Sequence, residues 1–86
     1  MNINQLIETV KNKLNKNIVC ENIKIEDKTF LHINHSSHDK NKFHIKLIIT
    51  SEYLKKKSKV QSTKDIYKIL NKELKENIHS IQILII

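Results

Sequence analysis

The chain has 86 residues and a formal net charge of +7, with 16 lysine and arginine residues against 9 aspartate and glutamate residues. A chain of this length has room for one domain, residues 1–86, and it buries only about 60% of its unfolded surface, which argues against a deep binding cleft. Its single cysteine, Cys20, excludes an intramolecular disulfide, and its longest apolar run is too short to span a bilayer.

The N-terminal sequence, the charge and the aromatic content limit where the protein is expected to act and which partners it is expected to bind. The N-terminus lacks the charged-then-apolar layout of a signal peptide, so we expect a cytoplasmic protein with no membrane partner; a mitochondrial or other organelle matrix is the alternative. The positive charge favours anionic partners, nucleic acid among them. Aromatic residues make up only 5% of the chain, which argues against single-strand binding by base stacking.

The first expected element is an amphipathic helix. Its apolar residues recur at helical spacing: Ile3, Leu6, Ile7, Val10 and Leu14. Asn2 or Asn4 is the expected N-cap, and the helix should end at residues 15–17. One face should pack on the core, while the lysines of the other face, Lys13 among them, should do no more than solvate it.

Two strands follow. In residues 18–29, Ile23 and Ile25 alternate with charged residues, which predicts a half-buried strand with Cys20 beside its start as a small packed side chain. Residues 43–50 are apolar enough to form the central strand of a sheet.

The segment between these strands, residues 32–42, is polar apart from Ile33 and carries three histidines: His32, His35 and His38. Two interpretations stay open. The segment is a solvated loop, or one of its imidazoles supplies a metal ligand, since neutral imidazole suits iron, zinc and copper. The spacing does not choose among the three histidines.

Residues 51–61 hold a run of four lysines: Lys55, Lys56, Lys57 and Lys59. Such a run is usually a solvated turn; the functional alternative is a patch that contacts phosphate ahead of a helix N-terminus. We expect that helix to run from Thr63 to about Asn77, with Ser62 or Thr63 as its cap.

The last expected element is an apolar strand, residues 78–86. His79 stands where the helix gives way to this strand, and we expect it to carry the function together with a second ligand from the histidine-rich loop. The order α-β-β-α-β predicts an α/β (α+β) fold. Its three-stranded mixed sheet should have the first two strands antiparallel and both helices on one face.

Several stretches match a known family in their order and spacing. They are Ile-Glu-Asp-Lys-Thr at 25–29 ahead of His32 and His35, His-Ile-Lys-Leu-Ile-Ile-Thr-Ser-Glu at 44–52, Leu-Lys-Lys-Lys-Ser-Lys-Val-Gln at 54–61, and Ile66-Tyr67, Leu70 and Glu73-Leu74 followed by Ile-His-Ser-Ile at 78–81. In this arrangement they resemble the BolA family over essentially the whole chain.

The resemblance implies a KH-like fold and partnership with a monothiol glutaredoxin. It further implies a two-iron, two-sulfur (2Fe-2S) cluster held between the proteins, in iron–sulfur cluster maturation and trafficking or in iron sensing. His79 would be one ligand and His35 the second, with His32 and His38 as alternatives. The remaining thiolates would come from the partner and its glutathione.

The alternative function is a nucleic-acid-binding regulator of transcription or stress responses. It would use the KH-like fold and a basic patch: Lys55, Lys56, Lys57, Lys59 and Lys64. Where the family has a glycine in this turn, the chain has Lys56, and without glycine a close backbone approach to phosphate is harder. We expect no enzyme activity, since the sequence offers no paired carboxylates in an apolar setting and no nucleophile next to a base. The free protein is expected to be a monomer.

Overall fold

The computed structural model of the chain describes residues 1–32 and 42–86, leaving the side chain of His32 aside. The elements follow one another as α1 (Ile3–Asn17), β1 (Asn22–Asp27), the 3-10 helix η1 (Thr29–His32), β2 (Phe43–Thr50), α2 (Glu52–Lys55), α3 (Lys59–Ile69), α4 (Asn71–Glu76) and β3 (Ile78–Ile85).

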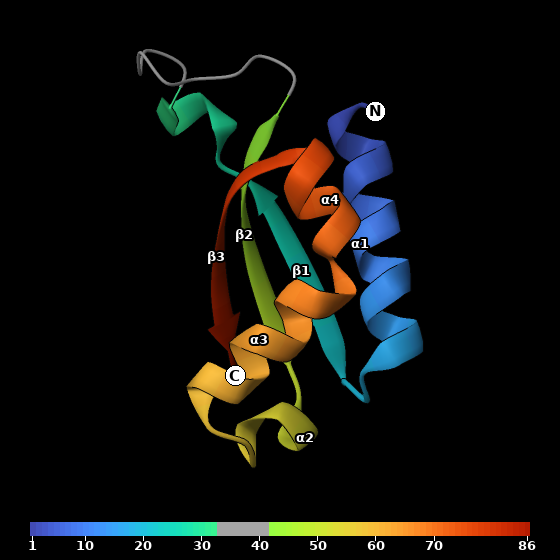
Figure 1. Cartoon of the computed structure of the whole chain (residues 1–86), viewed down its shortest axis with the longest axis vertical. Helices are drawn as coiled ribbons and strands as arrows, with labels where there is room; N and C mark the ends of the chain where they lie inside the picture. Colours follow the sequence, from blue (N-terminus) through green and yellow to red (C-terminus); the bar gives the residue numbers. More distant parts are fainter. Residues whose placement is uncertain (33–41) are drawn as a thin grey trace.

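The sheet has the order β1-β2-β3, with β1 antiparallel and β3 parallel to the central strand β2. The helices α1, α3 and α4 cover one face of it (Figure 1). This confirms the predicted mixed sheet, the central position of residues 43–50 and the placement of the helices on one face. The parallel pairing follows from the helical crossover between β2 and β3.

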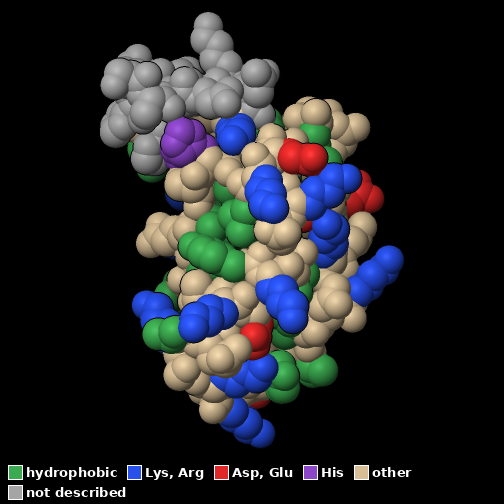
Figure 2. Space-filling view, in the orientation of Figure 1, with side chains coloured by type: hydrophobic (Ala, Val, Ile, Leu, Met, Phe, Trp, Pro, Cys, Tyr) green, Lys and Arg blue, Asp and Glu red, His purple; other side chains and the backbone are tan. Residues whose placement is uncertain are grey.

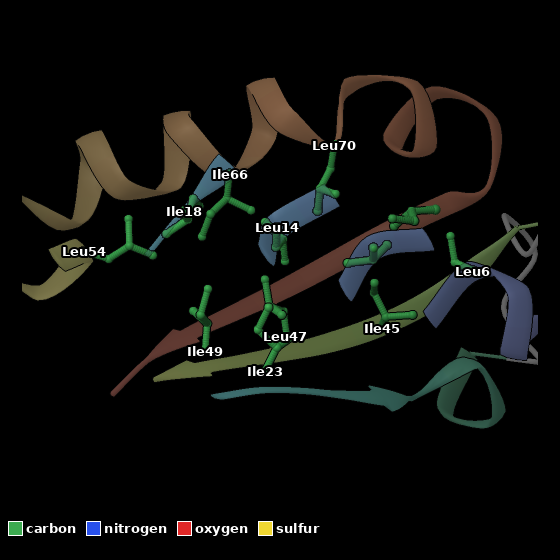
Figure 3. Packing of buried hydrophobic residues seen from close by; sticks show 12 residues of the cluster. Leu6, Leu14, Ile18, Ile23, Ile45, Leu47, Ile49, Leu54, Ile66 and Leu70 are labelled. Carbon is green, nitrogen blue, oxygen red and sulfur yellow. The ribbon is translucent and has the colours of Figure 1, made fainter. Parts of the chain in front are cut away.

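The core lies between this sheet face and the helices (Figure 3). The inward side chains of β2 are Ile45, Leu47 and Ile49, and they are at most 2% exposed. Facing them are the apolar stripes of the helices, including Leu6, Val10, Leu14, Ile66 and Leu70. The stripe predicted for α1 is therefore the face that packs, and burying it supplies most of the driving force for docking the helix.

The start of α1 is capped as the sequence predicts. The Asn2 side chain accepts a hydrogen bond from the Gln5 N–H at 2.8 Å, and the Gln5 side chain accepts one from the Asn2 N–H at 2.9 Å. This reciprocal capping box satisfies two backbone donors that the helix itself leaves unpaired.

The predicted start of the next helix is wrong. α3 begins at Lys59 with Ser58 as its cap, whose side chain accepts from the Gln61 N–H at 3.1 Å. Ser62 lies buried inside the helix, and its hydroxyl donates to the Leu54 carbonyl at 2.9 Å. Both serines suit a cap by type, and the tertiary contact with α2 decides between them, because it needs Ser62 in the helix.

The lysine run is also more ordered than a turn. Ser51 caps the short helix α2 by accepting from the Leu54 N–H at 3.0 Å. Leu54, 1% exposed, fixes α2 on the core. Lysine is a good helix former, so once Leu54 is buried the residues around it take up helical turns.

The predicted helix to about Asn77 is interrupted at Leu70. α3 ends at Ile69 and α4 begins at Asn71, with Leu70 at φ −95°, ψ 17° between them. The Leu70 N–H still bonds the Ile66 carbonyl at 3.0 Å. The chain therefore bends here without losing its backbone hydrogen bonds, and Leu70 itself stays fully buried.

One expectation about α1 fails in a way that matters for packing. Lys13 does not simply solvate the outer face: its ammonium lies 2.7 Å and 2.9 Å from the two carboxylate oxygens of Glu73 on α4. The Glu73 side chain is 5% exposed, against 36% for Lys13. This ion pair joins the first helix to α4, and no local pattern predicts it because the two residues are sixty positions apart.

None of the helices within residues 1–32 and 42–86 combines the length and the apolar character needed to cross a bilayer.

The buried ion pair yields a stability prediction. Glu73→Gln keeps the shape of the side chain but leaves Lys13 without its counter-charge, and we expect it to lower the free energy of unfolding by about 2 kcal/mol. Urea denaturation followed by circular dichroism measures this. Glu76→Gln, an exposed carboxylate on the same helix, is the matched control; equal losses in the two variants would contradict the assignment.

Candidate functional site

The candidate site lies on the sheet face that the helices leave open. Ile45, Leu47 and Ile49 point into the core, so the strand alternation directs His44 to the opposite face. His44 is nevertheless only 5% exposed. Side chains from β3 account for part of this burial.

An irregularity in β3 brings those side chains to His44. Ile78 is 2% exposed and Ile81 packs against the same core, although a regular strand would place residues three apart on opposite faces. The pairing steps from Phe43–Ile78 to His44–Ser80, so His79 is an extra residue between two pairs. Such a bulge re-aims side chains, and here both His79 and Ser80 contact the His44 ring.

The three side chains form a compact group. The Ser80 hydroxyl and Nδ1 of His44 share a hydrogen bond at 2.6 Å. The His79 ring stacks on the His44 ring with centroids 4.7 Å apart and an interplanar angle of 24°. His79 is exposed, so the arrangement presents one imidazole to solvent on a support made of another. A supported ring loses less conformational freedom when it binds a ligand.

Backbone contacts hold His44 in place as well. Its N–H donates to the Thr29 hydroxyl at 3.1 Å, and its carbonyl accepts from the Lys28 N–H at 2.7 Å. The Thr29 hydroxyl in turn donates to Asp27 Oδ1 at 2.6 Å. These bonds attach the start of η1 beside the stacked pair.

The histidine-rich segment is anchored next to this group at both of its ends. η1, which ends at His32, is tied to His44 through Thr29. On the other side, the Phe43 N–H donates to the Asn77 carbonyl at 2.9 Å, immediately before the strand that carries His79. His35 and His38 fall in residues 33–41, outside the described residues, as does the side chain of His32. The choice among them stays a prediction.

Cys20 lies at the other end of the sheet from His79. It precedes β1, whose first residue pairs with Thr50, and its thiol contacts Asn15 Oδ1 at 3.4 Å. Burial, and then the charge of Glu21, raise the pKa of this thiol above its ordinary value. It is partly buried and packs against the core, as predicted for a small packed side chain.

The described residues show one exposed imidazole and no complete metal site. Within 1–32 and 42–86, no three side chains of His, Cys, Asp or Glu come together as a possible metal site. His79 can supply one ligand bond, so any metal group bound there needs further donors. Imidazole nitrogen is an established donor to iron, and the outward position of His79 leaves room for a second protein.

The lysines of the predicted basic patch are not equivalent. Lys57 lies 2.7 Å from Asp65 Oδ2 and 4.5 Å from the centroid of the Tyr53 ring. Hydrogen bonds to Asp65 and Tyr53 raise the pKa of Lys57, and those from Lys57 and Gln61 lower the pKa of Asp65. The charge of Lys57 is therefore paired within the protein, with Asp65 and the Tyr53 ring.

The other lysines of the patch keep exposed side chains. Lys55 and Lys59 line a groove with Lys57, while Lys56 lies at the end of α2 and Lys64 on the outer side of α3. The structure brings Lys55, Lys57 and Lys59 to one groove and Lys59 and Lys64 to a neighbouring pocket, and a role for them in binding nucleic acid stays a prediction.

Sequence reasoning assigned no role to His44 and Ser80. A usable signal was present, because Ile78 and Ile81 are three positions apart in a strand whose later inward residues recur every two positions. That step predicts a bulge and places residues 79 and 80 on one side. The stacking of two histidines across neighbouring strands, by contrast, depends on the register.

The chain is similar to one protein family and to several solved structures. The family model described as BolA-like protein matches residues 14–86. The BolA domain of SufE1 from Arabidopsis thaliana is 29% identical with a TM-score of 0.75, over 91% of this chain and 86% of that one. A comparison with proteins of curated function gives no match.

Two further structures share the fold at lower identity. BolA1 from Arabidopsis thaliana is 23% identical with a TM-score of 0.74, over 91% of this chain and 86% of that one. BolA1 from Mus musculus is 17% identical with a TM-score of 0.71, over 90% of this chain and 60% of that one.

The Ser80–His44 hydrogen bond can be tested directly. Ser80→Ala leaves a nearly buried imidazole without its hydroxyl partner, and we expect a loss of about 1–2 kcal/mol in the free energy of unfolding. The His79 ring resonances in NMR spectra should also shift, because the ring beneath is no longer fixed. Gln82→Ala, on the same face, is the control and should cost less than about 0.5 kcal/mol. Unchanged His79 resonances in Ser80→Ala would contradict the support role.

The raised pKa of Cys20 predicts slow thiol chemistry at neutral pH. The rate of alkylation by iodoacetamide follows the thiolate fraction, so its pH midpoint should lie higher in the folded protein than in urea. Glu21→Gln should move that midpoint down, since the Glu21 charge is one of the two causes of the shift. A folded midpoint below the unfolded one would show that the thiol is activated instead.

Proposed function

This chain belongs to the BolA-like family, whose model matches residues 14–86, and we propose that it is a non-catalytic adaptor that binds a monothiol glutaredoxin. The two proteins would share a 2Fe-2S cluster, in iron–sulfur cluster maturation and trafficking or in iron sensing. The observation that supports this most is the exposed His79 imidazole, presented by a bulge and stacked on the nearly buried His44.

The donor chemistry suits this role. When bound, such a cluster supplies one-electron redox chemistry and a cofactor that can be handed on. A histidine in place of a thiolate removes negative charge from the cluster and raises its reduction potential. Histidine must be neutral to act as a ligand, so protonation favours release. His79 offers one bond, so a second histidine of this chain, a partner's thiolate and glutathione would complete the set.

The second ligand from this chain is proposed to be His35, with His32 and His38 as alternatives. The support is positional. The two flanks of residues 33–41 are hydrogen-bonded beside the stacked pair, through Thr29 to His44 and through Phe43 to Asn77.

We assign the Ser80–His44 hydrogen bond to positioning rather than to catalysis. The bond links the His44 imidazole, which is only 5% exposed, to the neighbouring strand β3. A side chain that supports His79 has to be fixed in this way. A ligating or cluster-facing histidine commonly needs such a fixed environment, since neighbouring contacts orient it and tune its basicity. A catalytic serine would need, in addition, donors poised for a developing oxyanion.

The test is co-expression with a monothiol glutaredoxin, followed by visible absorption and circular dichroism of the purified complex. We expect a coloured heterodimer whose spectrum changes in His79→Ala and in one of three single variants: His32→Ala, His35→Ala or His38→Ala. Gln82→Ala, an exposed residue further along β3, is the control and should leave the spectrum unchanged.

The experiment tests two assignments separately: the glutaredoxin as partner and His79 as ligand. Two proteins that do not associate and remain colourless would overturn the adaptor function. A coloured complex with an unchanged spectrum in His79→Ala would keep the partner but overturn the proposed ligand.

A further inference from the structure

A second surface lies at the opposite end of β3 from His79 and is independent of the cluster proposal. β3 is an edge of the sheet, since within residues 1–32 and 42–86 it pairs with β2 alone. The Ile86 N–H bonds the Ile49 carbonyl at 2.9 Å, and the Ile86 carbonyl accepts from the Ser51 N–H at 3.0 Å. Ile86 thus directs both backbone groups to β2.

The alternation of a strand then fixes what faces outward. If Ile86 turns its N–H and carbonyl to β2, Ile85 turns its own to the open edge, and Ile83 does the same. A row of backbone donors and acceptors of this kind is a template for one more strand.

A groove of about 240 Å³ runs beside this edge. β3 contributes Ile83, Leu84 and Ile85 to it, and Leu54 of α2 and Thr63 of α3 form the facing wall. Leu84 is 43% exposed although it is a large apolar side chain. An apolar wall next to an open strand edge suits alternate side chains of an extended peptide.

Lysines surround the groove: Lys55, Lys57 and Lys59. Lys57 is bound to Asp65, while the pair of Lys55 with Glu52 at 3.3 Å is between exposed side chains and therefore weak. Figure 2 shows exposed hydrophobic side chains among lysines on this side of the molecule. Lys55 and Lys59 therefore favour carboxylates on whatever occupies the groove.

The groove fits a peptide better than a nucleic acid. No aromatic side chain lines it, so bases have no stacking platform inside the groove. Lys56 adopts φ −77°, ψ −15°, and no described residue has a positive φ, so the turn lacks the glycine-type backbone that clamps phosphates in KH domains.

We propose that this groove binds an extended acidic segment of a partner protein, which adds to β3 as a fourth strand. Apolar side chains of the segment would lie beside the exposed Leu84 on the outer side of the sheet, and the carboxylates that alternate with them would face Lys55 and Lys59 on the helix side. The backbone bonds to Ile83 and Ile85 supply affinity, and the alternation of apolar and acidic residues supplies selectivity.

The probe is a capped, fluorescent peptide of about ten residues in which valine and glutamate alternate. Binding is measured by anisotropy, and the site by amide NMR shifts at Ile83 and Ile85. Two N-methylated versions of the peptide test whether it binds by strand addition. In each version, one of the two alternate sets of backbone N–H groups is blocked. Strand addition predicts that one version loses binding and the other keeps it. Equal binding of both versions would overturn the proposal, since a purely electrostatic contact does not use those groups.

The lysine contribution is tested with matched charge reversals. Lys55→Glu with Lys59→Glu should weaken peptide binding by about tenfold. Lys72→Glu with Lys75→Glu changes the net charge equally on exposed positions of α4 and should leave the affinity nearly unchanged. Equal weakening by both double variants would show that net charge alone causes the effect. It would overturn the proposal that the groove binds the peptide. An oligodeoxythymidylate of similar length that binds more tightly than the peptide and displaces it would assign the groove to nucleic acid instead.

Discussion

The two faces of β2 are the constraint on which the rest of the fold depends. Ile45, Leu47 and Ile49 are buried by the helices, so the residues between them must face the other way. Moving this strand by one residue would expose the whole apolar set, which fixes its register firmly. The same alternation places His44 on the open face. The position of the candidate site is thus a consequence of core packing.

β3 packs on the same core but contains one extra residue, His79, relative to its pairing with β2. Ile78 and Ile81 both pack inward although they are three positions apart, and the bulge at His79 absorbs the difference. Keeping both isoleucines buried leaves His79 and Ser80 together against His44. At its other end the strand returns to regular alternation and offers an open edge beside the lysines. One element therefore positions both the exposed imidazole and the groove, at opposite ends.

The net charge of +7 overstates the charge that is available to partners. Lys13 is committed to the buried carboxylate of Glu73, and Lys57 to Asp65 and Tyr53. These contacts join α1 to α4 and the α2–α3 turn to α3. What remains is concentrated in exposed lysines such as Lys55 and Lys59, where pairing with an external carboxylate costs at most the weak, exposed pair of Lys55 with Glu52.

The sequence by itself determined the main helices and strands, the mixed sheet and the inward stripes, because apolar periodicity is a local property of the chain. The helix cap at Ser58, the bend at Leu70 and the Lys13–Glu73 pair were decided by tertiary structure. Each of them depends on which distant surface an otherwise suitable residue meets. The stack of His44 and His79 belongs to the same class. The spacing of Ile78 and Ile81 holds a signal for the bulge, but only the parallel register of β2 and β3 set one imidazole on the other.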